Sequence, residues 1–167
     1  MGSRNLLSAP LTESNKKCGD TMFWIKNIFG KSKTQKLPPN TIVVDRDSVS
    51  MGDDYNGHRM SWQYGEDEML SSVLSCLKSY IPAMPQTVWA IHVGENVVGY
   101  YVCGDKDNNE EWHIELVGPD IKVSQLPEKS LFCKYFYKGA EAYFKELPDE
   151  MPLIEKVKKF YARKEED

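Results

Sequence analysis

Apolar and polar residues alternate with two different periods along the chain, and each period predicts one kind of element. Residues 41–49 form a β-branched run, and residues 59–64 alternate between polar and apolar side chains, which predicts two strands. Asn56-Gly57 lies between them and tolerates the positive φ values of a tight turn. We therefore expect an antiparallel hairpin over residues 41–64.

A helical period follows over residues 69–80. The apolar residues that recur every three or four positions there are Met69, Leu70, Val73, Leu74, Leu77 and Tyr80. The acidic run Glu66-Asp67-Glu68 precedes them, where a helix dipole favours negative charge, and Pro82 ends the segment because proline cannot donate to the helix. We expect Leu74 on the buried face of this helix.

The second half of the chain continues with β-rich runs and then returns to helical spacing. Residues 87–93, 97–103 and 112–117 predict three strands, the first two joined by a turn at Gly94. Residues 127–147 and 153–163 carry apolar side chains at helical spacing and predict two amphipathic helices.

The predicted order of elements is strand-strand-helix-strand-strand-strand-helix-helix. Because tight turns join adjacent strands, we expect an α+β fold with a mostly antiparallel sheet of about five strands and helices on one face. A β-grasp-like arrangement, in which the first hairpin cradles the helix of residues 69–80, is compatible with this order.

Residues 1–40 are predicted to lie outside a single α+β domain that spans residues 41–167. Residues 1–21 are polar and lack a hydrophobic period, as in a disordered leader. Residues 22–36 combine one or two turns of basic amphipathic helix with the start of a linker. Met22 is an alternative start of the natural chain.

Charge is distributed unevenly behind the formal net value of −4. Residues 1–40 hold seven Lys or Arg against two Asp or Glu, whereas residues 45–68 hold seven Asp or Glu against two Arg. An acidic surface repels nucleic-acid phosphates and attracts basic proteins over long range. We therefore expect a basic protein as partner and no nucleic acid. The alternative is that acidic loops only keep a small protein soluble.

The composition and the cysteines favour a reducing compartment. With 41% hydrophobic and 28% charged residues, the chain has the composition of a globular domain, and it contains no apolar run of membrane-spanning length. The four cysteines show no C-x-x-C spacing, and no signal peptide precedes them. We therefore expect free thiols, a cytoplasmic location and no disulfide framework.

The leading functional interpretation is a non-enzymatic protein-binding module without a cofactor. No nucleophile elbow, P-loop or dinucleotide fingerprint occurs in the chain. Tyr55 or an exposed Trp62 would supply the apolar anchor of the interface. The predicted partner-binding residues are Asp53, Asp54, Tyr55, His58, Trp62, Glu66, Asp67, Asp105, Asp107, Glu110 and Glu111.

Three alternatives rest on other residues. Asp53, Asp54 and His58, with Asp45 or Asp47, would serve a metal-dependent hydrolase if the loop brought their side chains together. His92, Cys103 and His113 would form a zinc site or a Cys-His pair if they shared a face. Residues 22–36 would contact an anionic membrane through their apolar and basic side chains, whereas docking of the same residues onto the domain is the competing interpretation.

Several segments of the chain occur together in a recognisable order. They are the D-S-V-S-M-G-D-D run of residues 47–54, His58, a helix ending in Tyr-Ile-Pro and the strand Thr-Val-Trp-Ala-Ile. In these segments the chain resembles a group of small uncharacterised bacterial proteins. The likeness covers about residues 41–103 and implies a compact sheet-and-helix domain. In size and charge the chain also resembles bacterial immunity proteins, which bind and block a toxin made by the same strain. This second resemblance implies toxin neutralisation.

Overall fold

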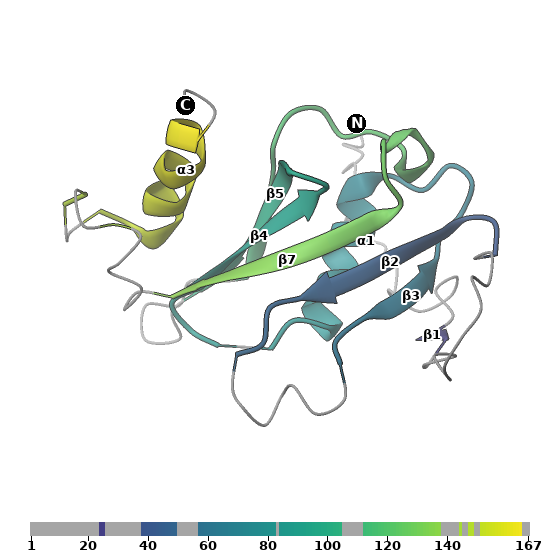
Figure 1. The fold of residues 1–167 in the computed structure, drawn as a ribbon, viewed down its shortest axis with the longest axis horizontal. Helices are drawn as coiled ribbons and strands as arrows, with labels where there is room; N and C mark the ends of the chain where they lie inside the picture. The colour runs from purple at the N-terminus through teal and green to yellow at the C-terminus, as the bar shows by residue number, and fades with distance from the viewer. Residues whose placement is uncertain are drawn as a thin grey trace, which may run out of the picture.

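A computed structural model describes most of the chain, and it has the α+β class predicted from the sequence (Figure 1). The described residues are 24–25, 38–49, 57–82, 84–104, 112–137, 144, 147–148 and 151–164.

The described strands form one mixed sheet in the order β1-β3-β2-β7-β4-β5-β6 (Figure 1). The strands are β1 Trp24–Ile25, β2 Thr41–Arg46, β3 Met60–Gln63, β4 Thr87–Val93, β5 Asn96–Cys103, β6 His113–Leu116 and β7 Ser130–Tyr137. The helices are α1 Leu70–Cys76 with the 3₁₀ turn η2 Leu77–Ser79, the 3₁₀ turn η4 Val123–Gln125, and α3 Leu153–Lys164. Within the sheet β2 and β7 run parallel, and the other neighbours are antiparallel.

Both predicted hairpin pairings are present. β2 pairs antiparallel with β3, with Val44 opposite Met60, and Gly57 before β3 has a φ of 61°. β4 pairs antiparallel with β5, and Gly94 between them has a φ of 58°. Glycine has no Cβ and adopts positive φ angles at little energetic cost. It therefore allows the chain to reverse direction between the two strands of each hairpin.

The predicted helix over residues 127–147 is wrong over most of its described part, because Ser130–Tyr137 form strand β7. This strand lies between β2 and β4 in the middle of the sheet. Leu131 and Cys133 pack on one face and Phe136 on the other, all with 0–1% exposure. A strand covered on both faces carries apolar side chains on both, so the two-residue period disappears and helical spacing arises by coincidence.

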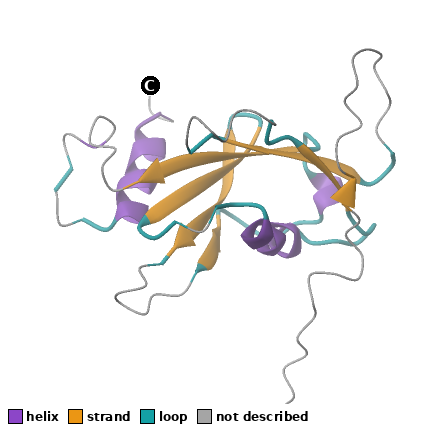
Figure 2. Ribbon diagram, turned by 90° about the horizontal axis from the view of Figure 1, so that it is seen from below, coloured by secondary structure: helices purple, strands orange, loops and turns teal. Residues whose placement is uncertain are grey.

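The helices pack on both faces of the sheet, so the expectation of helices on one face is wrong (Figure 2). α1 packs on the face that carries Trp89 and Ile91, whereas α3 packs on the face that carries Val88 and Ala90. Because successive residues of a strand point to opposite faces, this alternation within β4 separates the two apolar clusters.

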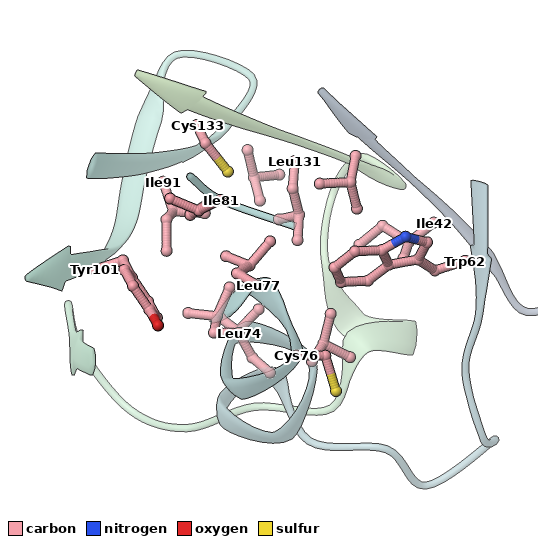
Figure 3. Packing of buried hydrophobic residues seen from close by; sticks show 14 of the residues in the cluster. Ile42, Trp62, Leu74, Cys76, Leu77, Ile81, Ile91, Tyr101, Leu131 and Cys133 are labelled. Atoms are coloured by element: carbon pink, nitrogen blue, oxygen red, sulfur yellow. The ribbon is translucent and has the colours of Figure 1, made fainter. Parts of the chain in front are cut away.

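The larger cluster lies between α1 and the sheet and contains the side chains drawn in Figure 3. Leu74 and Leu77 of α1 point into it and are 0% exposed, which confirms the predicted buried face of the helix. Trp62 enters the cluster from β3 and Tyr101 from β5 (Figure 3). Burial of these side chains supplies the main driving force for placing α1 on the sheet.

Two expectations about the cysteines and the N-terminal region change. Cys103 and Cys133 are buried free thiols as expected, but Cys76 is disulfide-bonded. β1 pairs with β3, with Trp24 opposite Trp62, so the predicted helical turn is wrong at these two residues. The rest of residues 22–36 lies outside the described part of the chain. None of the described helices is long and apolar enough to span a bilayer.

Candidate functional site

The structure describes only part of the acidic surface predicted from the sequence, namely His58, Trp62, Glu66 and Asp67. The other predicted residues lie outside the described residues: Asp53, Asp54, Tyr55, Asp105, Asp107, Glu110 and Glu111.

Trp62 is not an exposed anchor, so this part of the prediction is wrong. Its side chain is 2% exposed and packs edge-on against Tyr80, with ring centroids 5.8 Å apart. The apolar positions of the β3 alternation are Met60, Trp62 and Tyr64, so the alternation itself places Trp62 on the buried face. Because Trp62 faces α1, it contributes to the core and cannot contact a partner.

His58 lies before β3, and Glu66 and Asp67 lie after it, so they occupy opposite ends of this strand (Figure 1). The predicted residues therefore do not form one continuous described surface. Glu66 and Asp67 lie close to the start of α1, whereas His58 lies where the loop from β2 returns to the sheet.

The acidic residues near α1 have structural partners. Lys122 donates to the Asp67 carboxylate at 2.6 Å, and this contact lowers the pKa of Asp67 and raises that of Lys122. Asp120 accepts hydrogen bonds from the Ser71 hydroxyl at 2.5 Å and from the Ser71 backbone N–H at 3.0 Å, and these lower the pKa of Asp120. The backbone contact satisfies a donor in the first turn of α1. These carboxylates join the start of α1 to the segment after β6.

A different group of side chains lies at the opposite end of β3, around the ends of the loop between β2 and β3. We call this group the loop mouth, and it consists of Arg46, Asp47, His58, Tyr80, Tyr135 and Tyr137. Arg46 and Asp47 come from the end of β2, His58 from the return of the loop, Tyr80 from the end of η2, and the two tyrosines from β7.

One half of the loop mouth is built around Tyr80. The guanidinium carbon of Arg46 lies 5.8 Å from the centre of the Tyr80 ring, within the range of a cation–π contact. The Tyr80 hydroxyl donates to the His58 carbonyl oxygen at 2.6 Å. Tyr80 therefore joins the two ends of the loop to each other and to Trp62 in the core.

The other half is built around Asp47. Its carboxylate accepts the Tyr135 backbone N–H at 2.9 Å, and its own N–H donates to the Cys133 carbonyl oxygen at 3.0 Å. Tyr135 stacks on Tyr137, with ring centroids 5.7 Å apart, and on the inner side it contacts Trp89 at 4.9 Å. Trp89, Tyr135 and Tyr137 therefore form a row of aromatic rings from the core to the surface, where Tyr137 is 47% exposed.

Tyr137 is an exposed aromatic residue that sequence reasoning missed, as is Phe132 of the same strand. Tyr137 falls within the predicted helix over residues 127–147, whereas the structure places it at the end of β7, stacked on Tyr135. The segment is rich in aromatic residues, which favour strands, and this composition is the signal that could have indicated a strand.

The predicted zinc site or Cys-His pair does not form. Cys103 lies on the α1 face, where burial raises the pKa of its thiol. His92 lies on the α3 face, with its Nε2 atom 2.8 Å from the Tyr161 hydroxyl, and His113 contacts Glu115 at 3.3 Å. Cys103 lies on one face of the sheet and the two histidines lie on the other. They therefore cannot bind the same metal ion or form a Cys-His pair.

Among the described residues, no three His, Cys, Asp or Glu side chains lie close enough together to hold a metal ion. The predicted loop site at Asp53 and Asp54 lies outside them. Comparison of the chain with protein-family models, curated proteins and solved structures gave no match. The resemblances to small bacterial proteins therefore stay hypotheses, and the loop mouth is evaluated from its own geometry.

Proposed function

We propose that the protein is a binding module that engages a basic protein partner at the loop mouth. The observation that carries the proposal is the exposed Tyr137 ring, which stacks on Tyr135, the residue whose backbone N–H is bound by Asp47 after β2. Protein interfaces combine a central aromatic anchor with a polar or charged rim, and tyrosine is enriched among the residues that dominate binding energy. Tyr137 takes the role that the sequence assigned to Trp62.

The Tyr137 side chain is held in position by neighbouring residues, which supports its role as an anchor. Its ring rests on Tyr135, whose backbone is held by Asp47 and whose ring rests on the fully buried Trp89. An anchor held in place by packed neighbours loses less conformational entropy on binding than a mobile one.

The support from charge comes from the chain that enters the loop. Asp45, Asp47, Asp53 and Asp54 stand against Arg46 over residues 45–54. Long-range attraction between such a segment and a basic partner accelerates association, and the effect weakens as salt screens the field.

We also propose a β-grasp-like topology for the domain. The supporting features are the β2–β3 hairpin followed directly by α1, the β4–β5 hairpin after it, and the last strand β7 placed parallel to β2 in the middle of the sheet. In this arrangement the first hairpin and the central strands cradle α1, and the loop mouth lies at one end of the hairpin.

The concrete form of the proposal is neutralisation of a basic toxin by occlusion, as the likeness in size and charge to immunity proteins suggests. A metal-dependent hydrolase using Asp53, Asp54 and His58 is the second candidate, and a peripheral membrane protein using residues 22–36 is the third. Calorimetric titration with Mg²⁺, Mn²⁺ and Zn²⁺ tests the second candidate. Flotation with anionic liposomes tests the third.

The test of the leading candidate is quantitative capture of proteins from a lysate of the source organism. Wild-type protein is compared with Tyr137→Ala and with Asp53→Asn/Asp54→Asn. The matched control is Glu66→Gln/Asp67→Asn, which removes the same number of carboxylates at the other end of β3. A true partner is a basic protein that Tyr137→Ala and the Asp53/Asp54 variant both lose and the control retains. Equal recovery with all variants would show that the loop mouth is not the binding surface.

A further inference from the structure

Strand β6 forms one edge of the sheet, and its outer side is the feature from which the inference starts. Among the described strands, β6 pairs only with β5. Val117 donates its N–H to the Val98 carbonyl oxygen at 3.0 Å, and the register stays regular back to His113. In an antiparallel pair every second residue directs its backbone groups to the neighbour. His113 and Glu115 therefore face β5 with their amides, and Trp112, Ile114 and Leu116 direct theirs outward.

The side chains of the same segment alternate in chemistry. Trp112, Ile114 and Leu116 are half-buried against the larger apolar cluster. On the other face His113 and Glu115 lie within 3.3 Å of each other, with side-chain exposures of 54% and 33%. Lys158 of α3 also contacts Glu115 on that face, at 2.7 Å. The edge thus presents an apolar row on one face and His113, Glu115 and Lys158 on the other.

We propose that this edge binds a second copy of the chain, so that two β6 strands pair antiparallel across a two-fold axis at Ile114. In this register Ile114 lies opposite Ile114 of the second copy, and Trp112 lies opposite Leu116. All three outward-facing residues then exchange backbone hydrogen bonds. An isologous contact of this kind uses the same surface on both subunits and closes as a dimer.

Charge complementarity selects this register over its neighbours. With the axis at Ile114, His113 of each copy lies opposite Glu115 of the other. Moving the axis to residue 115 would place two Glu115 carboxylates opposite each other, and moving it to residue 113 would take Glu115 away from the position opposite His113. Like charges directly opposite in a sheet are destabilising, whereas opposite charges stabilise the pair. The apolar row also continues across the Ile114 axis without interruption.

The experiment is sedimentation velocity of the full chain over a dilution series. The chain has a mass of 19.2 kDa, and we expect the mass to double at high concentration. Ile114→Pro removes an outward N–H without removing a bond to β5. We expect it to raise the concentration at half-dimerisation by about tenfold or more, which corresponds to about 1.4 kcal/mol. Ile114→Val keeps the N–H and serves as the matched control, and circular dichroism checks the fold of both.

A charge variant keeps the test independent of proline. His113→Glu places two carboxylate pairs across the axis and is expected to weaken the dimer by about tenfold. Ser124→Glu adds the same charge on the exposed η4 turn and should have no effect. Mixing His113→Glu with Glu115→His restores both opposite pairs and should yield a heterodimer that neither variant forms with itself.

A chain that stays monomeric at every concentration would overturn the proposal. A dimer whose midpoint is the same in Ile114→Pro and His113→Glu would overturn it as well, because the contact would lie elsewhere. β6 and the loop mouth lie in different parts of the sheet, so loss of dimerisation leaves the partner-capture result intact, and failure of partner capture leaves the dimer intact.

Discussion

The contact between Leu74 of α1 and Gly99 of β5 gives the sharpest test of the packing. Leu74 is 0% exposed, so Leu74→Ala removes buried methyl groups and leaves a cavity, which costs about 2–5 kcal/mol of unfolding free energy. A Cβ placed on Gly99 would lie 3.0 Å from Leu74 Cδ1 and 3.0 Å from the Glu115 carbonyl oxygen. Gly99→Ala therefore overpacks the same site and should cost about 1–3 kcal/mol.

The two effects are coupled because one methyl group enters the space that the other substitution vacates. We expect Leu74→Ala/Gly99→Ala to lose about 0.5–3 kcal/mol less than the two single variants together. Urea unfolding followed by circular dichroism measures all three. Ser75→Ala, on the exposed side of α1, is the control and should change stability by less than about 0.5 kcal/mol. A loss below about 1 kcal/mol for Leu74→Ala, or strict additivity of the pair, would refute the packing described for α1.

Two further predictions concern α3 and the thiols. Lys158 contacts Glu115 at 2.7 Å and lowers the pKa of that carboxyl below its ordinary 4.5, so the pair stabilises the fold above pH 4.5 and the effect is lost as the pH falls through the lowered pKa. Lys158→Gln should thus reduce stability by about 0.2–1 kcal/mol at pH 7 and by nothing at low pH, and a difference that persists at low pH in urea titrations would contradict this. Burial raises the pKa of Cys133 to about 12, so iodoacetamide at pH 8 should leave Cys133 and Cys103 unmodified until the protein is denatured, whereas Cys76 should also require reduction. Mass spectrometry of the labelled peptides distinguishes these cases, and rapid native labelling of Cys133 would show that its site is open.

The parts of the fold predicted correctly are those with a local signal. Gly94 supplies the positive φ that its turn requires, and alternation or a β-branched run on either side defines β4 and β5. The α1 period is equally local, and Leu74 lies on the face that the period predicts.

The prediction for residues 130–137 was wrong because the contacts that make this segment a strand come from residues far away in the sequence. Apolar side chains are required on both faces only because α1 and α3 cover both, and neither contact is visible in residues 130–137. The same error hid Tyr137, since a ring assigned to a helix core is not considered as an anchor. For Trp62 the strand was predicted correctly, and its alternation with Ser61 and Gln63 already placed the ring on the apolar, buried face, so the pattern contradicted the proposed exposed anchor.

The most direct test of the proposed binding function is the rate of association with the captured partner, measured by stopped flow over a range of salt concentrations. We expect Asp53→Asn/Asp54→Asn to slow association and flatten its salt dependence, and Tyr137→Ala to act mainly by accelerating dissociation. Glu66→Gln/Asp67→Asn should match the wild type, because Lys122 already pairs with Asp67. A dissociation rate for Tyr137→Ala equal to that of the wild type would contradict binding at the loop mouth, and an unchanged association rate for the Asp53/Asp54 variant at low salt would contradict steering by the acidic loop.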